Sequence, residues 1–424
     1  MSHPFLYDHA PQRVYWETTN ACDLACRHCR AEARPERDPS ELSTDEGRKL
    51  FAELARFGTP LPHLVLTGGD PLKRSDLFDL IGAARDMGFG VSVAPSATPL
   101  LTREAIFSLK KAGVDAISLS IDGSDPERHD FIRGIEGTFE RTREAAKAAR
   151  EAELPFQVNT LVCAATVDDL PAIYKEVVAI GAARWSLFFL VTVGRGNVLE
   201  PISQERAEEV LVWVAKLAAE RMARPGRGGL VITTTEAPQL RRVVAEQKRL
   251  HAHEHPSPEG QSTHPSSVHT RAAEPTHGGH PSGVHTQTVE PTHGGHPGGQ
   301  VKALGHDAGS QAPKNGGHGQ HAHHGAGIRD GNGILFISNT GEICPSGFLE
   351  VSAGNVRTSD LVAVYRSAPL FTGLRDPDHF GGRCGICEYR HACGGSRARA
   401  FSAFGDPMAE DPLCPHEPTL ASPS

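Results

Sequence analysis

Short apolar runs alternate with amphipathic stretches from about residue 13 to residue 250, and this alternation restricts the chain to an α/β fold. Each run is rich in β-branched or aromatic residues and ends at Gly, Pro, Asp, Ser or Thr, which is typical of strands. The predicted strands cover residues 14–18, 63–67, 89–94, 116–121, 156–162 and 185–191, with a further strand at 230–235. The predicted helices include residues 43–57, 103–112, 138–152 and 168–180. Strands joined by crossover helices run parallel, so the pattern predicts a partial (β/α)6 TIM-type barrel.

A low-complexity segment at residues 251–327 interrupts this pattern. It is dominated by His, Gly, Pro, Ser and Thr, and it contains 15 of the 23 histidines of the chain. Because it lacks the apolar surface that offsets the entropy of ordering, we predict a disordered insertion. Two interpretations stay open: a linker expanded by repeat slippage, or a metal-binding segment, since neutral imidazoles bind nickel, zinc and copper.

The globular pattern returns at about residue 328. The stretch GILFISNTGEI predicts a hairpin that turns at Asn339, Thr340 and Gly341. The cysteine- and glycine-rich end that follows has little apolar content, and such a small domain usually needs a bound metal to fold. The predicted organisation is an N-terminal tail at 1–12, the barrel at 13–250, the insertion at 251–327, a small cysteine-rich domain at 328–416 and a disordered tail at 417–424.

Composition narrows the functional class. The net charge of −8 argues against a dedicated nucleic-acid binder. The first residues do not form a signal peptide, and no stretch approaches the roughly 18 consecutive apolar residues of a membrane span. We therefore expect a cytoplasmic protein with neither a nucleic-acid nor a membrane partner. In that reducing compartment the nine cysteines are not expected to form disulfides, and their clustering indicates metal or iron–sulfur ligation.

The first cluster, Cys22, Cys26 and Cys29, follows the first predicted strand. Three thiolates bind three irons of a cubane and leave the fourth iron open to a small molecule, whereas a structural zinc site requires four ligands. A zinc site with His28 as the fourth ligand is the alternative, although these adjacent residues would crowd a tetrahedral ion. The position favours catalysis, because the catalytic groups of βα barrels come from loops at the carboxyl ends of strands.

This CxxxCxxC spacing after a first barrel strand resembles the signature of the radical S-adenosylmethionine (SAM) superfamily. The resemblance implies a [4Fe–4S] cluster whose open iron is chelated by SAM. It also implies reductive cleavage of SAM to a 5′-deoxyadenosyl radical that abstracts hydrogen from the substrate. The electron would come from a reducing partner such as flavodoxin or ferredoxin. His28 matches a position near the adenine in this superfamily, with an ordinary loop histidine as the alternative.

Several further loops match SAM-contacting positions of the superfamily. Gly68, Gly69, Asp70 and Pro71 resemble its GGEP motif, which binds the SAM amino group, with Asp70 in place of the usual glutamate. Taken alone, two glycines allow close backbone approach to a ligand, and the carboxylate could accept from an ammonium group. Polar residues at the ends of other predicted strands are further candidates for contact with SAM. They are Ser96, Ser120, Asp122 and Asn159. At Asp122 the alternative is an ordinary Asp–Gly turn.

The segment RHDFIRGIEGTF resembles a motif of SPASM-type radical SAM enzymes, and its His129, Asp130 and Arg133 are predicted to be structural. The second cysteine cluster comprises Cys384, Cys387, Cys393 and Cys414. Its spacing alone allows zinc or [4Fe–4S], but beside the first cluster it resembles the SPASM extension, which holds auxiliary clusters.

The second cluster departs from a full SPASM domain. Ser396 lies where that domain has a further cysteine shortly after the third ligand, and only Cys344 remains upstream. We therefore predict a single auxiliary [4Fe–4S] cluster, with Cys344 not a ligand. Cys163, inside an apolar strand, is predicted to be a core cysteine.

Two stretches indicate the reaction. WETTNACDLACRHCRAEA and CGGSRARAFSAFGDPMAEDPLC resemble the radical SAM enzymes of alternative haem biosynthesis, which oxidatively decarboxylate propionates of iron-coproporphyrin, and their relatives in denitrification-haem synthesis. The resemblance implies a small-molecule porphyrin substrate. Two alternatives stay open: a maturase of a ribosomally made peptide, and a metal- or haem-binding chaperone that uses the histidine-rich insertion. No catalytic base or radical-relay residue is identified from the sequence.

Overall fold

The computed structural model describes residues 6–222, 229–254 and 327–419. Most of the insertion predicted to be disordered lies outside the described residues, as do the outermost residues of both predicted tails. The first four residues of the predicted insertion, 251–254, belong to a helix, so the helical pattern extends slightly further than expected. Within the described residues, no helix has the length and apolar content to span a membrane.

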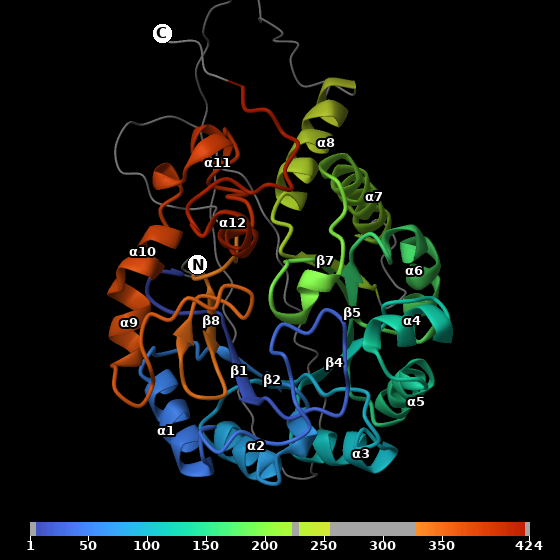
Figure 1. The fold of residues 1–424 in the computed structure, drawn as a ribbon, viewed down its shortest axis with the longest axis vertical. Helices are drawn as coiled ribbons and strands as arrows, with labels where there is room; N and C mark the ends of the chain where they lie inside the picture. The colour runs from blue at the N-terminus through green and yellow to red at the C-terminus, as the bar shows by residue number, and fades with distance from the viewer. Residues whose placement is uncertain (1–5, 223–228, 255–326, 420–424) are drawn as a thin grey trace, which may run out of the picture. The chain divides into compact units, whose positions relative to one another are not determined.

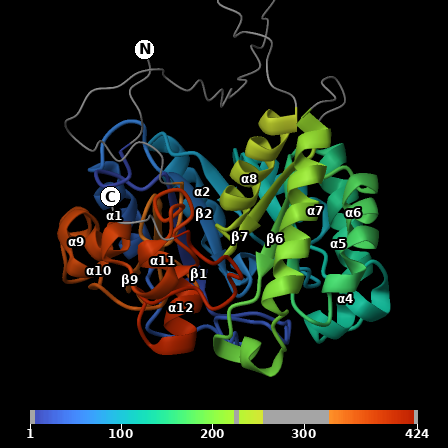
Figure 2. The same cartoon turned by 90° about the horizontal axis from the view of Figure 1, so that it is seen from above.

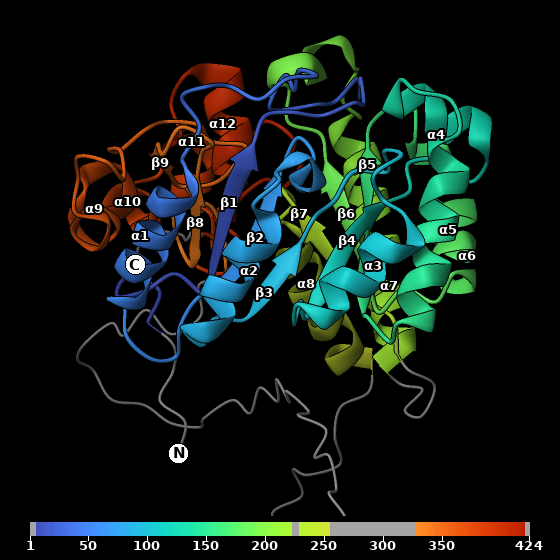
Figure 3. The same ribbon diagram turned by 90° about the horizontal axis from the view of Figure 1, so that it is seen from below.

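A nine-stranded sheet forms the centre of the fold, in the order β7-β6-β5-β4-β3-β2-β1-β8-β9. Its strands are β1 (Arg13–Thr19), β2 (His63–Gly68), β3 (Val91–Val93), β4 (Ala116–Ser120), β5 (Phe156–Val162), β6 (Arg184–Phe189), β7 (Val231–Thr235), β8 (Ile334–Ile337) and β9 (Ile343–Cys344). Every neighbouring pair is parallel except β8 and β9, which form the predicted antiparallel hairpin. The curved sheet ends at β7 and β9, so the partial barrel expected from the sequence is confirmed (Figure 3).

Strand β8 enters the sheet beside β1, although about 300 residues separate the two strands in the sequence. Its backbone pairs in register with the first half of β1, and Arg13 aligns with Ile334. The hairpin predicted for the cysteine-rich domain therefore extends the barrel sheet on the far side of β1.

Helices cover the outer face of the sheet (Figure 1). They are α1 (Thr44–Ala55), α2 (Leu77–Asp86), α3 (Arg103–Lys111), α4 (Pro126–Arg133), α5 (Thr138–Glu151), α6 (Leu170–Ala179), α7 (Gln204–Met222) and α8 (Leu240–Glu254). The capping box at Ser43 and Glu46 fixes the start of α1, as the sequence predicts. The short helices η1 (Pro71–Lys73), η2 (Val167–Asp169), η3 (Gly194–Val198) and η4 (Pro377–His379) lie in connections.

The cysteine-rich end folds against the β1 and β8 side of the sheet (Figure 2). Its helices are α9 (Leu361–Ser367), α10 (Pro369–Leu374), α11 (Gly382–Ile386) and α12 (Arg397–Phe404). Helix α9 packs against α1, and the hydroxyl of Tyr365 in α9 donates to the carbonyl of Tyr7. Helix α9 thus contacts the N-terminal segment of the described chain.

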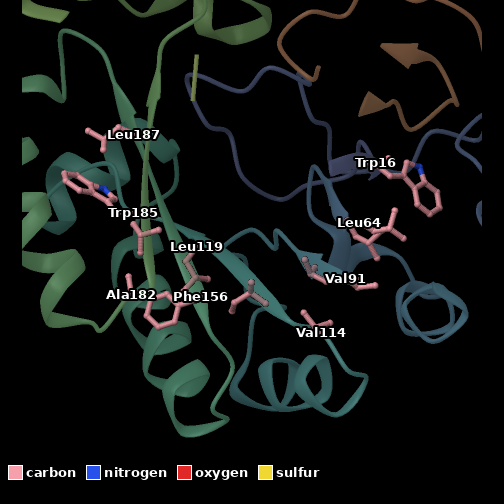
Figure 4. Close-up of a cluster of buried hydrophobic side chains, with 14 of the residues drawn as sticks. Trp16, Leu64, Val91, Val114, Leu119, Phe156, Ala182, Trp185 and Leu187 are labelled. Atoms are coloured by element: carbon pink, nitrogen blue, oxygen red, sulfur yellow. The ribbon is translucent and has the colours of Figure 1, made fainter. Parts of the chain in front are cut away.

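The strands bury one face far more than the other. Leu64 and Leu66 of β2 are buried, whereas Val65 between them is partly exposed, and β4 alternates in the same way. The buried face packs against the helices as the main core, in which Figure 4 shows Trp16 and Trp185. The opposite, inward face is lined by small and polar side chains that stay partly exposed, among them Ser92, Ser118, Ser120, Gln157 and Asn159. This barrel therefore lacks the tightly filled interior of a closed (β/α)8 barrel.

Candidate active site

The three cysteines of the first cluster lie in the loop that follows β1, at the carboxyl edge of the parallel strands. Cys22 is only 6% exposed, and the backbone N–H of Leu24 donates to its sulfur at 3.4 Å. The N–H of Cys29 donates to the carbonyl of Cys26, which closes the turn between them. Burial raises the pKa of the Cys22 and Cys26 thiols, so a bound cation is needed to hold them as thiolates at neutral pH.

The three sulfurs of the first cluster do not all lie as close together as the ligands of a single ion. Zinc–thiolate bonds of about 2.3 Å place tetrahedral sulfur ligands about 3.8 Å apart. Within the described residues, only Cys387, Glu388 and His416 form a group of three or more potential ligands whose atoms all lie within 4.8 Å of one another. The sulfurs of Cys22, Cys26 and Cys29 are more widely spread, as the corners of an iron–sulfur cubane require.

Arg133, at the end of α4, anchors the cysteine loop. Its guanidinium donates to the sulfur of Cys26 at 3.8 Å and forms an ion pair with the buried carboxylate of Asp122. Asp122 also accepts from the backbone N–H of Leu161 at 2.7 Å. Burial opposes ionisation of Asp122, but the Arg133 guanidinium holds the pKa of this carboxyl group below its usual value. Asp122 therefore positions Arg133, and Arg133 contacts the predicted cluster ligand Cys26. The sequence did not indicate this contact.

The loop after β6 supports the cysteine loop from another side. The Arg195 guanidinium donates to the carbonyl of Cys26 at 3.0 Å and to that of Ala33 at 3.1 Å. A side chain at Gly194 would place its Cβ 2.3 Å from the carbonyl oxygen of Arg30, and its φ of +52° also favours glycine. Sequence reasoning missed this contact; the only signal was a glycine-rich VGRGN stretch after a predicted strand.

The two glycines of the GGDP segment pack against the cysteine loop. The N–H of Gly69 donates to the carbonyl of Thr19, and a Cβ at Gly69 would lie 2.4 Å from the carbonyl oxygen of Ala21. The glycines are therefore required because the backbone of the GGDP segment lies directly against the backbone at Thr19 and Ala21. The buried carboxylate of Asp70 accepts from the N–H of Leu72 and the hydroxyl of Thr98, so it braces these loops. Pro71 begins helix η1 directly after it.

Ser96 connects the GGDP segment to the first cysteine. Its hydroxyl donates to the carbonyl of Gly69 at 2.6 Å and lies 3.6 Å from the sulfur of Cys22. Ser120 and Asn159 are register partners on β4 and β5, and both face the partly exposed interior. The structure thus brings Ser96 into the cysteine site and places Ser120 and Asn159 on the adjacent interior wall.

The two histidines of this region are both held neutral. Burial, with a smaller contribution from Arg133, lowers the pKa of His28 and of His129 to about 4. The Nδ1 of His28 is buried without a hydrogen-bond partner, whereas the Nδ1 of His129 accepts from the backbone N–H of Asp122. Asp130 accepts from three donors at the start of α5. The structural roles predicted for His129 and Asp130 are therefore confirmed.

The four C-terminal cysteines line one pocket, although up to 30 positions separate them in the sequence. Backbone N–H groups donate to Cys384, Cys387 and Cys393 at 3.4–3.5 Å. Burial raises the pKa of Cys393 to about 12 and that of Cys414 to about 11, so these thiols also need a bound cation to ionise. No three of these sulfurs, all of which are described, lie mutually within 4.8 Å. Cys387 does lie within 4.8 Å of ligand atoms of Glu388 and His416, of which His416 also lines the pocket.

The two remaining cysteines lie elsewhere. Cys163 is fully buried and packs in a small apolar cluster with Ile132 and Leu161, which confirms the predicted core position. Cys344 is buried in β9, and burial raises its pKa to about 12. That Cys344 is not a ligand stays a prediction. None of the nine cysteines, all of which are described, forms a disulfide.

Comparison with known proteins identifies the family. The model of the radical SAM superfamily matches residues 16–177. The chain is 32% identical over 409 residues to the AdoMet-dependent heme synthase of Methanosarcina barkeri (strain Fusaro / DSM 804), covering 96% of this chain and 97% of that protein. It is 33% identical over 412 residues to the AdoMet-dependent heme synthase of Nitratidesulfovibrio vulgaris, covering 97% and 94%.

The fold has solved counterparts as well. Streptococcus suis SuiB bound to S-adenosylmethionine has a TM-score of 0.63 at 14% identity, covering 96% of this chain and 78% of SuiB. SuiB bound to its precursor peptide SuiA gives a TM-score of 0.62. Because the similarity to the heme synthases extends over nearly their full length, the chain belongs to their family within the radical SAM superfamily, whose enzymes use a [4Fe–4S] cluster to cleave SAM.

Proposed function

We propose that this enzyme oxidatively decarboxylates propionate side chains of an iron porphyrin. The observation that carries the proposal is a loop of three spread thiols, anchored by Arg133 and Arg195, that opens beside a polar and partly exposed barrel interior. The full-length similarity to AdoMet-dependent heme synthases supports a porphyrin as the substrate. With its cofactors bound, the site supplies a 5′-deoxyadenosyl radical that removes a hydrogen atom from the substrate.

The chain's own residues hold the cofactors in this proposal. Cys22, Cys26 and Cys29 hold the [4Fe–4S] cluster, and its open iron is left for SAM. The remaining contacts to SAM come from the loops at the carboxyl edge of the sheet. We assign them to His28, Gly68, Gly69, Asp70, Pro71, Ser96, Ser120, Asp122 and Asn159.

The carboxylate of Asp70 has a bracing role, so we assign the contact of the GGDP segment with the SAM amino group to backbone carbonyls. Ser96 is hydrogen-bonded to one of these carbonyls, that of Gly69. Neutral His28 suits contact with an uncharged adenine ring.

The second pocket is assigned to electron transfer. Cys384, Cys387, Cys393 and Cys414 hold one auxiliary [4Fe–4S] cluster, and four thiolates leave no iron open to a small molecule. When a propionate loses a hydrogen atom and carbon dioxide, one electron remains, and this cluster is its acceptor. A flavodoxin- or ferredoxin-like reductant supplies the electron for SAM cleavage. Nine free cysteines fit the reducing cytoplasm.

Anaerobic turnover of reconstituted protein tests the proposal. With SAM and dithionite we expect 5′-deoxyadenosine to form together with decarboxylated iron-coproporphyrin, both followed by mass spectrometry. 5′-Deoxyadenosine without any change in the porphyrin would exclude this substrate. Modification of a candidate precursor peptide in place of the porphyrin would favour the peptide-maturase alternative.

A further inference from the structure

Three arginines beside the C-terminal cysteines have no carboxylate partner. Among the described residues, Arg241, Arg329 and Arg397, here called the arginine triad, form no ion pair within 4 Å, although other arginines of this region do. The paired arginines are Arg242 with Glu208, Arg383 with Glu410, Arg390 with Asp378 and Arg399 with Asp411. Two further carboxyl groups lie in the region, those of the buried Asp330 and the partly buried Glu236, and Asp330 acts electrostatically on Arg329, but neither lies within 4 Å of a triad guanidinium. The triad therefore carries positive charge that no direct ion pair neutralises.

Two members of the triad are buried, and Arg241 is partly buried. Arg397 is fully buried and Arg329 is 5% exposed. The Nε and one terminal nitrogen of Arg329 are buried without any hydrogen-bond partner, and the other terminal nitrogen reaches only the carbonyl of Leu374 at 3.5 Å. Burial, reinforced by Arg241 and Arg397, lowers the pKa of Arg329 to about 10. Asp330 offsets part of this charge, but buried guanidinium nitrogens without hydrogen-bond partners are unfavourable, so the group favours a further negative charge nearby.

The triad lies behind the lining of the cysteine pocket, in contact with the segments that carry the cysteines, whereas Arg242, Arg383 and Arg390 line the pocket itself. Arg397 donates to the sulfur of Cys384 at 3.5 Å, and Arg241 donates to the carbonyl of Ala392, the neighbour of Cys393. Two glycines allow this approach. A Cβ at Gly395 would lie 2.6 Å from the Arg397 guanidinium and 3.0 Å from the Cys384 sulfur. A Cβ at Gly394 would lie 3.4 Å from the Cζ of Arg329.

We propose that the arginine triad stabilises the reduced state of the auxiliary cluster and so raises its reduction potential. This inference rests on the cluster assigned above to Cys384, Cys387, Cys393 and Cys414. A [4Fe–4S] cluster with four thiolates is a dianion when oxidised and a trianion after it gains one electron. Fixed positive charge in a low-dielectric site favours the state with the extra electron, and local charge is one of the factors that set cluster potentials. The triad thereby makes this cluster an electron acceptor.

Electron paramagnetic resonance during a redox titration of the full-length, reconstituted protein tests the inference. The auxiliary signal is identified as the one that Cys384→Ala removes, and dithionite supplies the electrons. At a fixed solution potential we expect Arg329→Gln to lower the ratio of reduced to oxidised auxiliary cluster at least tenfold, equivalent to about 59 mV for one electron. Arg329→Lys should retain most of the wild-type potential because it keeps the charge.

Control variants separate the possible results. Arg357→Gln removes an exposed arginine that is paired with Glu46, and it should leave the potential unchanged. If Arg329→Gln prevents cluster assembly, Arg241→Gln gives the same test, with a smaller shift in the same direction. An unchanged potential in a fully loaded Arg329→Gln or Arg241→Gln protein would overturn the inference. Wild-type protein with iron and sulfide for only one cluster would instead overturn the proposed auxiliary cluster itself.

Discussion

The two cysteine sites use the same ligand but differ in ligand number and in the balance of nearby charge. The first has three thiols in a loop after β1. The arginine that contacts a sulfur there, Arg133, is neutralised by Asp122, and one further arginine, Arg195, donates only to backbone carbonyls of the loop. The second has four thiols and three neighbouring arginines without carboxylate partners. A missing fourth thiolate leaves room for a small molecule on the metal, whereas uncompensated positive charge favours uptake of an electron. Ligand count and charge balance therefore separate a reactive centre from an electron-accepting one.

Removing one thiolate from the first site should have the largest effect. Cys26→Ala leaves two thiolates for three irons, so we expect no 5′-deoxyadenosine above the enzyme-free background. Liquid chromatography of anaerobic reactions measures the yield. Cys163→Ala is the matched control, because this buried cysteine lies outside both sites. An undiminished yield in Cys26→Ala would refute the assignment of the first site.

Removing one thiolate from the second site should separate the two functions. Cys384→Ala should abolish porphyrin decarboxylation while 5′-deoxyadenosine still forms, because the first site keeps its ligands. Iron analysis and electron paramagnetic resonance should detect the loss of one cluster. Cys344→Ala should retain both clusters. Equal loss of 5′-deoxyadenosine in Cys384→Ala and Cys26→Ala would mean that the two sites do not act separately.

The sequence predicted the βα core well because its signal is local. The strands at 156–162 and 63–67 were placed within one residue, since period-two burial and flanking turn residues mark them. The pairing of β8 with β1 was not predicted, because it joins segments on either side of a low-complexity stretch. No local pattern encodes which distant strand becomes the neighbour.

The cysteine ligands of the candidate site were predictable from the sequence, but the charged residues around them were not. Cysteine spacing located both sets of ligands, because a cluster imposes a characteristic local pattern on a loop. The charged groups around them were not found: Arg195, Arg241 and Arg329 come from other segments, and no spacing rule relates them to a cysteine. Asp70 also shows that a motif position can brace the loop that carries it.

The buried ion pair beside the first site should make a large contribution to stability. Arg133→Met leaves the Asp122 carboxylate buried without its partner, which should destabilise the protein by about 3–5 kcal/mol. Anaerobic thermal denaturation measures the change. Arg103→Met, which removes an arginine that is 58% exposed and is paired with the exposed Glu151, should change the stability by less than about 1 kcal/mol. Adding Asp122→Asn to Arg133→Met should recover part of the loss, and no recovery would contradict the ion-pair explanation.

His129 should make the stability near this site depend on pH. Its pKa is lowered from 6.5 to about 4 in the folded protein, so the unfolded chain binds a proton first as the pH falls. The stabilisation is complete above pH 6.5 and is lost as the pH falls toward 4, at about 1.4 kcal/mol per pH unit. Arg133 disfavours the protonated ring, while Asp122 and Asp130 favour it. His129→Asn keeps an acceptor for the Asp122 N–H and should reduce the slope of the profile between pH 6.5 and 5, measured by denaturation, while His28 contributes the remaining slope. Identical profiles would contradict the neutral state of His129.

Replacing residues 255–326 with a short Gly/Ser linker should have the smallest effect on the two sites. All nine cysteines lie outside this stretch, and each contact described above for either site comes from outside it. Shortening a long connection changes the loop-closure entropy only slightly, by about 0.6 kcal/mol for each twofold change in length. Iron content and 5′-deoxyadenosine yield should therefore stay within twofold of wild type, and the reduction potential of the auxiliary cluster should be unchanged. If the histidines are ligands, calorimetry should show weaker binding of nickel or zinc. Loss of turnover with both clusters intact would instead show that the histidine-rich stretch takes part in the reaction. That result would favour the metal- or haem-binding chaperone alternative over an enzyme that needs only its two cysteine sites.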